Sequence, residues 1–345
     1  MRSSGVLPVA FFIMLVCISC KTPKVKSVAG LPERAIKESQ LTLPHSRPFY
    51  LKATIVEATN PDNDGYNAEI EEYWMSPKKW RRTVKASEFS QILIVNGDET
   101  SEQLVGDYYP NWLRTMVNAI LDPGAELQGL DMTKSSDNPM PMSGGMFCRR
   151  FAFRAGIPPI GNNVFSTYCF QGDLLASAGG PGYSADYSDY KKFKKRKIAH
   201  KIREYIEPGT EVGATIVELR ELKSPDKSLI AIEQPNEPLR TVVVSEDALR
   251  GLATNAPNPQ WPPIDGGKPV GVLSIYVCVD RLGHVRETYG LNSDNPWMTD
   301  AARKQVMNWT FKPPTNQGQS VQLEGILTFA YQTTIEAKSG VRDSP

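Results

Sequence analysis

Residues 269–331 constrain the fold more than any other stretch, because their apolar spacing changes along the chain. Alternate residues are apolar in Val270–Asp280, which is typical of a half-buried strand. A second strand is predicted over Val285–Leu291, after a short turn. Asn295–Trp309 then has the i, i+3, i+4 spacing of an amphipathic helix, and Leu323–Tyr331 predicts a last strand. This order predicts a small sheet with one helix across its apolar face.

The ends of the expected helix also carry signals. Asn295 is a suitable cap, and Pro296 stands in the first turn, where proline is tolerated. Trp309 closes the apolar stripe and Phe311 begins the exit, so both side chains are expected to be buried.

Several short motifs in this stretch resemble the TonB C-terminal domain, the periplasmic end of bacterial energy transducers. The matching residues form a turn, a helix and its exit: Asp280, Gly283, Val285, Ala301, Ala302, Trp309, Phe311, Lys312 and Pro313. A later turn at residues 316–321 fits the same pattern. The resemblance implies a TonB-like domain over residues 257–335, followed by a disordered tail at 336–345. It also implies a partner such as an outer-membrane transporter or receptor, bound by β-strand addition.

The N-terminus predicts export from the cytoplasm. Arg2 precedes an almost wholly apolar run, Gly5–Ser19, which is shorter than the ~20 residues of a membrane-spanning helix. Residues 1–20 end in a sequence that resembles a bacterial lipobox, so Cys20 is expected to be lipidated. Lys21 follows, which by analogy with enteric sorting favours the outer membrane. The expected location is the periplasm with a lipid anchor; an uncleaved signal anchor is the alternative.

The remaining cysteines fit an oxidising compartment. Cys148 and Cys169 lie in neighbouring strand-like segments, and we expect them to form a disulfide. The alternative is two unrelated buried thiols. Cys278 lies inside an expected strand and is most simply a small core residue.

Residues 45–232 predict a mainly antiparallel sheet with helical pieces, one of them marked by Trp112 and Leu121. Their features resemble the lipoprotein carrier (LolA)-like fold, a curved half-barrel sheet lined by helices. The segments that carry this weaker resemblance are residues 73–82, 95–98, 189–193 and 224–229. The predicted fold class for the whole chain is α+β.

Three segments are expected to lack regular structure. Residues 21–44 are polar without a sustained period and predict a flexible tether. Residues 131–145, rich in Met, Ser, Pro and Gly, predict a loop. Residues 233–256 predict a proline-rich connector, although Thr241–Val244 and a short helix capped by Ser245 can belong to the C-terminal domain.

No catalytic constellation is recognisable, and we expect a non-enzyme without cofactor or metal. The three histidines, His45, His200 and His284, lack metal-ligand spacing, and no phosphate loop or dinucleotide fingerprint occurs. With 39 basic and 38 acidic residues, the charge balance gives no reason to expect nucleic-acid binding. The basic run Lys191–Lys197 could contact anionic lipid headgroups, or simply be a solvated connection between strands.

Two binding functions remain. The first is an adaptor in envelope or transmembrane transport, binding a partner by strand addition at the last strand (Leu323, Gly325, Leu327, Phe329 and Tyr331). The second is a carrier or sensor of lipid or lipoprotein acyl chains, held in an apolar groove of the half-barrel. The candidate groove residues are Phe49, Leu51, Ile55, Trp74, Trp80, Ile94 and Trp112. A fully packed core is the alternative for these residues.

Overall fold

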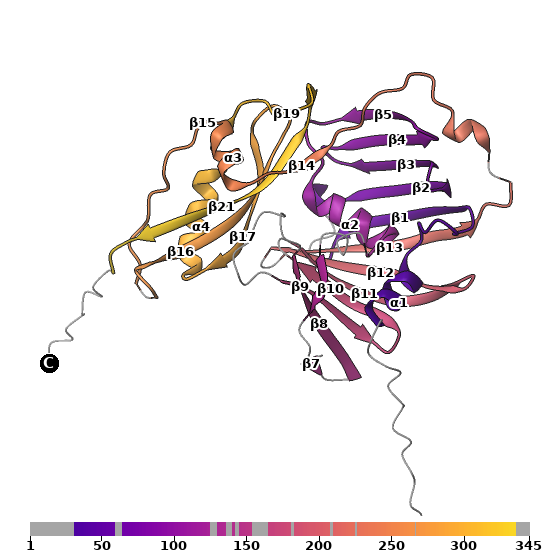
Figure 1. Ribbon diagram of the computed structural model, residues 1–345, viewed down its shortest axis with the longest axis horizontal. Coiled ribbons are helices and arrows are strands. Elements are labelled where there is room, and N and C mark those ends of the chain that lie inside the picture. Colours follow the sequence, from indigo (N-terminus) through magenta and orange to yellow (C-terminus); the bar gives the residue numbers. More distant parts are fainter. Residues whose placement is uncertain are drawn as a thin grey trace, which may run out of the picture.

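The computed structural model describes residues 31–58, 64–124, 130–135, 140–141, 145–153, 165–180, 183–207, 210–224, 226–265 and 267–335. The expected signal peptide with Cys20, and the expected tail at 336–345, lie outside the described residues. Two sheets account for most of the described part, and each carries its own helices (Figure 1). None of the described helices is long and apolar enough to cross a membrane.

The larger sheet contains thirteen strands among the described residues. They are β1 (Phe49–Glu57), β2 (Ala68–Ser76), β3 (Lys79–Ala86), β4 (Ser90–Asn96), β5 (Glu99–Val105), β6 (Leu130–Ser135), β7 (Met140–Pro141), β8 (Met146–Phe153), β9 (Phe165–Gln171), β10 (Leu174–Gly180), β11 (Tyr183–Phe193), β12 (Arg196–Glu207) and β13 (Thr210–Glu221). The order is β5-β4-β3-β2-β1-β13-β12-β11-β10-β9-β8-β6, with β7 paired to β8. The antiparallel pairing of β1 with β13 joins two meanders into one sheet.

Helices cover the apolar side of this sheet. Helix α1 (Leu31–Ser39) lies near β10 and β12, and helix α2 (Asn111–Leu121) lies across β11 and β12 (Figure 1). The 3₁₀ turns η1 (Asp64–Tyr66) and η4 (Lys227–Ile230) also belong to the described part of this region. The spacing of Trp112, Met116 and Ile120 places all three on the buried face of α2. They join the inward side chains of the strands in one hydrophobic core.

The smaller sheet is mixed. Its strands are β14 (Thr241–Val243), β16 (Val270–Val279), β17 (Val285–Ser293) and β21 (Gln322–Gln332), in the order β14-β21-β16-β17. Only the pairing of β14 with β21 is parallel. Further short elements are α3 (Glu246–Leu252), β15 (Ala253–Asn255), α4 (Pro296–Val306), β18 (Thr310–Phe311), β19 (Thr315–Asn316) and β20 (Gln319–Ser320). The predicted order of strand, strand, helix and strand is confirmed by β16, β17, α4 and β21.

Helix α4 begins and packs as its sequence predicts. The side chain of Asn295 accepts a hydrogen bond from the backbone N–H of Trp297, so it caps the helix. Met298, Ala302 and Val306 face the core of the small sheet. Trp309 is 2% exposed, and its ring meets that of Phe329 edge-on at 5.9 Å. The expectation that Trp309 and Phe311 are buried is confirmed.

The turn between β16 and β17 explains why Asp and Gly stand there. The Asp280 carboxylate accepts hydrogen bonds from the backbone N–H groups of Leu282 and His284, which closes the turn. Gly283 has a φ of +92°, and a Cβ there would lie 2.1 Å from the Phe311 carbonyl oxygen. Glycine is therefore required both by the backbone conformation and by the close approach of the exit segment.

Several expected boundaries differ from the structure. Residues 31–39 form α1 instead of a flexible tether, because Ala35 and Ile36 bury one face of this segment in the core. The expected loop at 131–145 contains most of β6 and β7, which pair with β8. Helical content is low, so the chain is mostly β rather than α+β.

The expected proline-rich connector is also partly ordered. β14 pairs with β21, and α3 packs beside it, so residues 241–255 are built into the small-sheet region. Ser245 caps α3 by accepting from the Ala248 N–H, as predicted. Asn236 covers the outer edge of β5: its N–H and side-chain amide donate to the carbonyls of Thr100 and Glu102. Asn236 thus occupies hydrogen-bonding positions that another strand would use.

The two sheet regions are docked through the segment that leads into α2. The amide of Gln322 forms two bonds with the backbone of Tyr109: Tyr109 N–H donates to Oε1 at 2.7 Å, and Nε2 donates to the carbonyl at 3.2 Å. One turn further, Arg114 pairs with Glu324. Both partners in the small sheet lie on β21. These contacts make α2 part of the core of one region and of the interface with the other.

Candidate functional site

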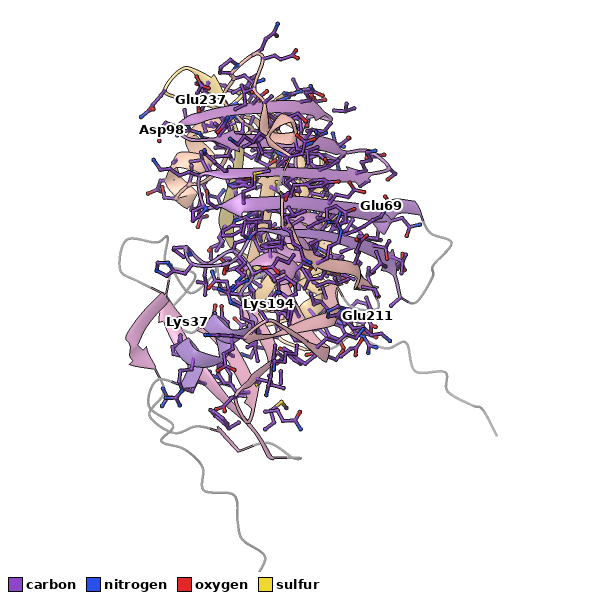
Figure 2. All side chains as sticks on the ribbon, turned by 90° about the vertical axis from the view of Figure 1, so that its right-hand side faces the viewer. Lys37, Glu69, Asp98, Lys194, Glu211 and Glu237 are labelled. Atoms are coloured by element: carbon purple, nitrogen blue, oxygen red, sulfur yellow. A yellow bond between two sulfur atoms is a disulfide. The ribbon has the colours of Figure 1, made fainter. Side chains whose placement is uncertain are left out.

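The β11–β12 hairpin carries the basic run Lys191–Lys197. Phe193 ends β11 and pairs with Arg196, which begins β12. The turn between them consists of Lys194 and Lys195, and Lys194 has a φ of +57°. In Figure 2, Lys194 projects from the ribbon near α1, the helix that carries Lys37. The basic run is therefore the tip of a tight hairpin.

The chain between α1 and β1 is held against this hairpin. The guanidinium of Arg196 donates to the carbonyl oxygens of Gln40 at 2.6 Å and Leu41 at 3.0 Å. The N–H of Leu41 donates to the carbonyl of Leu121 at the end of α2, at 3.0 Å. Leu41 is buried as a result. These contacts hold the backbone of residues 40–41 against the start of β12 and the end of α2.

A basin lies between these segments, with a volume of about 450 Å³. Leu41, Phe49 and Phe193 form its apolar floor; Phe193 is half-buried, whereas Leu41 and Phe49 are only 1% and 0% exposed. The rest of the lining is polar or cationic: His45, Ser46, Arg47, Lys194, Lys195 and Arg196. Four of the lining residues carry a positive charge, and no lining residue is acidic. The basin therefore combines an apolar floor with a cationic rim, and its volume lies within the range of small-molecule sites.

One carboxylate just outside the basin organises part of the rim. Glu221 pairs with Lys194 at 2.6 Å and with Arg47 at 3.0 Å, and these two partners lower the pKa of Glu221. Lys195 has no ion pair within 4.0 Å among the described residues. The ammonium group of Lys195 is the rim cation that remains available to an anionic ligand.

Most of the predicted groove residues do not line the basin. Five of them are buried in the packed core: Phe49, Leu51, Ile55, Trp74 and Trp112. Trp80 is half-buried, with the Arg82 guanidinium over its ring at 4.9 Å, and Ile94 is half-buried on β4. These positions fit the packed-core alternative. Only Phe49, the first residue of β1, also lines the basin.

The predicted edge strand β21 is not an edge over its whole length. β14 pairs with Gln322–Glu324, so the strand begins inside the sheet. Further along, Thr328 N–H donates to the Glu246 carboxylate at 3.1 Å, and Arg250 donates to the Thr328 carbonyl at 3.0 Å. Leu323, Leu327, Phe329 and Tyr331 point into the core, and Gly325 packs against α3. The expected edge strand is therefore covered by β14 at its start and by two side chains of α3 further along.

The remaining motif residues lie around α4 and its exit. Ala302 is buried in the core of the small sheet, and Ala301 is half-buried. Val285 begins β17 and is buried. Lys312 donates its backbone N–H to the Leu252 carbonyl at 2.8 Å, which ties the exit, followed by Pro313, to α3. These residues shape the fold and do not converge on a pocket.

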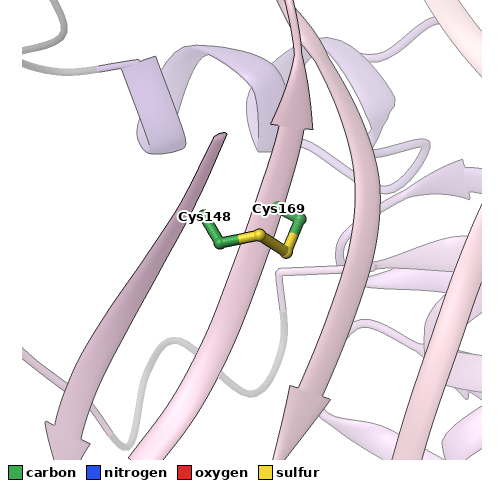
Figure 3. The surroundings of a disulfide bond; sticks show 2 residues. All are labelled: Cys148 and Cys169. Atoms are coloured by element: carbon green, nitrogen blue, oxygen red, sulfur yellow. A yellow bond between two sulfur atoms is a disulfide. The ribbon is translucent and has the colours of Figure 1, made fainter. Parts of the chain in front are cut away.

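The predicted disulfide between Cys148 and Cys169 is confirmed. The two residues face each other on the neighbouring strands β8 and β9 (Figure 3). Cys278 is buried on β16, as expected for a small core residue. Within the described ranges no cluster of three metal-ligating side chains occurs, and His200 and His284 lie outside the basin.

The sequence indicated the cationic side of the basin and Phe49 of its floor, but not Leu41 or Phe193. The basic run at 191–197 was the available signal. The convergence of Leu41, Phe49 and Phe193 has no counterpart in local spacing, since the three residues come from a loop and two strands far apart in the chain.

Three solved structures superpose on part of this chain. A LolA superfamily protein from Nitrosomonas europaea superposes with a TM-score of 0.40 at 9% identity, over 59% of this chain and 97% of the other. A domain described as an outer membrane lipoprotein-sorting protein, from Vibrio parahaemolyticus, gives 0.35 at 9% identity over 57% and 92%. A DUF1329 family protein from Desulfovibrio piger gives 0.36 at 9% over 54% and 90%.

No protein-family model matches the sequence, and no curated protein matches it. At this identity and these TM-scores, the similarity assigns neither family nor function to the chain.

Proposed function

We propose that this chain is a non-enzymatic protein of the bacterial cell envelope that binds the acyl chain of an anionic lipid or lipoprotein. The observation that carries the proposal is the basin beside the β11–β12 hairpin, with an apolar floor and a rim of cations. The disulfide between Cys148 and Cys169 supports an oxidising compartment such as the periplasm.

The chemistry of the basin matches an amphiphile with a negative head. Phe193 offers apolar surface to a hydrocarbon chain, above the buried side chains of Phe49 and Leu41. Lys195 and its neighbours offer positive charge where the chain would leave the basin. Anionic headgroups attract such clusters of Lys and Arg. A neutral lipid would contact the apolar floor but would not pair with the cations of the rim, so it should bind more weakly than an anionic lipid.

The test is binding of palmitate labelled with a fluorophore to the chain lacking residues 1–20. We expect Lys195→Gln to weaken binding about tenfold, the loss expected for one hydrogen bond to a charged group. Phe193→Ser should weaken binding as well, because it removes part of the floor. Lys227→Gln serves as the matched control, since Lys227 lies on η4, outside the basin. Equal affinities for all three variants and the unsubstituted chain would reject the proposal.

A second candidate function is strand addition to the outer edge of β21, as the TonB resemblance implies. It is favoured by the backbone of Thr328, whose N–H and C=O both point away from β16 and bond to side chains of α3. Side-chain partners can be displaced by a strand that offers the same hydrogen bonds. The backbone groups of Ala330 point the same way, because the direction alternates along a strand.

Proline at Ala330 tests this candidate, because it removes an outward N–H and leaves the pairing with β16 intact. Ala330→Ser is the control, since it keeps the N–H. In native envelopes, proteins crosslinked to the small-sheet region should be lost with Ala330→Pro and retained with Ala330→Ser. Retention by a folded proline variant would exclude strand addition at this edge.

A further inference from the structure

A second cavity lies where the two sheet regions meet, beside the N-terminal end of α2. Its volume is about 660 Å³. One wall comes from η1 and the segment around α2, with Tyr66, Tyr108 and Trp112. The other comes from β17 and α4, with Arg286, Arg303 and Lys304. We call it the inter-sheet cleft; neither its position nor its lining is shared with the basin.

The aromatic wall of the inter-sheet cleft is held in place. The rings of Tyr66 and Trp112 meet edge-on at 5.4 Å, and Trp112 is anchored in the core of the large sheet. The guanidinium of Arg286 lies over the ring of Tyr108 at 4.5 Å. The half-buried rings of Tyr66 and Tyr108, held in position beside buried Trp112, present a preformed apolar surface to a planar ligand, which lowers the entropic cost of binding.

The opposite wall has a surplus of positive charge. Three cations line the cleft against two carboxylates, those of Glu287 and Asp300. Both carboxylates already have partners: Glu287 accepts from Asn111 N–H at 3.1 Å, and Asp300 pairs with Arg303 at 3.7 Å.

The three cations differ in the number of hydrogen bonds and ion pairs that they already form. Arg303 also donates to the Thr288 carbonyl at 3.0 Å, and Arg286 pairs with Asp280 at 3.5 Å. Lys304 is exposed and makes no ion pair within 4.0 Å among the residues that the structure describes. Its ammonium group therefore gives the cleft an uncommitted positive charge opposite the aromatic wall.

We propose that the inter-sheet cleft binds a small aromatic anion, whose ring packs on Tyr66 and Tyr108 and whose charged group pairs with Lys304. Such a ligand touches η1 and α2 on one side and β17 and α4 on the other. Its binding therefore stabilises the docking of the two sheet regions.

Two fluorescent probes with the same rings test the proposal. 8-Anilinonaphthalene-1-sulfonate carries one sulfonate, and N-phenyl-1-naphthylamine is the same molecule without it. Titrations use the chain lacking residues 1–20 with Lys195→Gln as a common background, so that the basin contributes equally throughout. We expect Lys304→Gln to weaken binding of the sulfonate probe about tenfold, as for one hydrogen bond to a charged group, and to change binding of the neutral probe less than about twofold.

Lys312→Gln is the matched control, because Lys312 is exposed on the same region and does not line the cleft. It should leave both affinities unchanged. The thermal midpoint of the background chain should rise with the sulfonate probe, and rise less in Lys304→Gln. The proposal is wrong if Lys304→Gln and Lys312→Gln bind the sulfonate probe equally, or if Lys304→Gln weakens both probes alike.

Discussion

The carboxylate of Glu287, on β17 of the small sheet, caps helix α2 of the large-sheet region. Both of its oxygens lie 3.1 Å from the backbone nitrogen of Asn111, the first residue of α2. Pro110 at the cap position makes no side-chain capping bond, so the helix receives this acceptor from the other region. A negative charge at a helix N-terminus is stabilising. Burial nevertheless raises the pKa of Glu287 to about 7, against the lowering effect of the Asn111 N–H and of Tyr289.

This titration predicts a pH dependence of stability. The folded-state pKa of Glu287 is about 7, above the ordinary value of 4.5. The folded protein therefore holds the proton over a range in which the unfolded chain loses it. The stabilisation from protonated Glu287 is complete below pH 4.5 and is lost as the pH rises through about 7. Glu287→Gln is neutral at every pH and should lack this loss.

The measurement is thermal unfolding of both proteins at pH 5, 6, 7 and 8. We expect the thermal midpoint of Glu287→Gln minus that of the unsubstituted chain to increase from pH 5 to pH 8. Exposed Glu233→Gln is the control and should follow the unsubstituted chain. Parallel curves for Glu287→Gln and the unsubstituted chain would contradict the shifted pKa.

Trp309 should be a main determinant of the stability of the small sheet. Its side chain is 2% exposed and packs between α4 and Phe329. Trp309→Ala should lower the free energy of unfolding by ~3–5 kcal/mol, the usual range for deleting a large buried aromatic. Trp297, in the first turn of α4, is 69% exposed and serves as the control. Trp297→Ala should stay within ~0.5 kcal/mol in denaturant titrations; equal losses for both would show that Trp309 is not a core residue.

The disulfide should contribute to stability in the oxidised protein. Cys148 and Cys169 are 21 residues apart, and closing a loop of that size contributes ~3 kcal/mol in the loop-entropy model. The double variant Cys148→Ser/Cys169→Ser should unfold at lower urea concentration by a corresponding amount. Added reductant should lower the stability of the unsubstituted chain and leave that of the double variant unchanged. Coincident unfolding curves without reductant would mean that the bridge is not formed.

Cys20 should anchor the protein to a membrane through a covalent lipid. The motif at residues 18–20, after a short apolar run, motivates this prediction. Cys20→Ser should move the protein from the membrane fraction to the soluble periplasmic fraction in cell fractionation. Fractionation of Cys20→Ser with membranes, as for the unsubstituted protein, would point to an uncleaved signal anchor instead.

Local spacing predicted the elements well where one face of each element is buried. The alternation of Leu273, Ile275 and Val277 predicts β16, and the Asn295 cap predicts the start of α4. Both follow from periods of two and 3.6 residues, which a single segment displays by itself. The same reasoning missed α1, because its apolar face is short and surrounded by polar residues.

The sequence alone therefore determined those elements that bury one periodic face, such as β16 and α4, the turn at Gly283, and the expected pairing of Cys148 with Cys169, because these depend on neighbouring residues or on adjacent strands. The tertiary structure decided what each element lies against. β21 became an inner strand at its start because β14, some 80 residues earlier in the chain, pairs with it in parallel. The basin formed because a loop and two distant strands bring Leu41, Phe49 and Phe193 together. Glu287 caps α2 across a separation of 176 residues, and no local period records a contact of that kind.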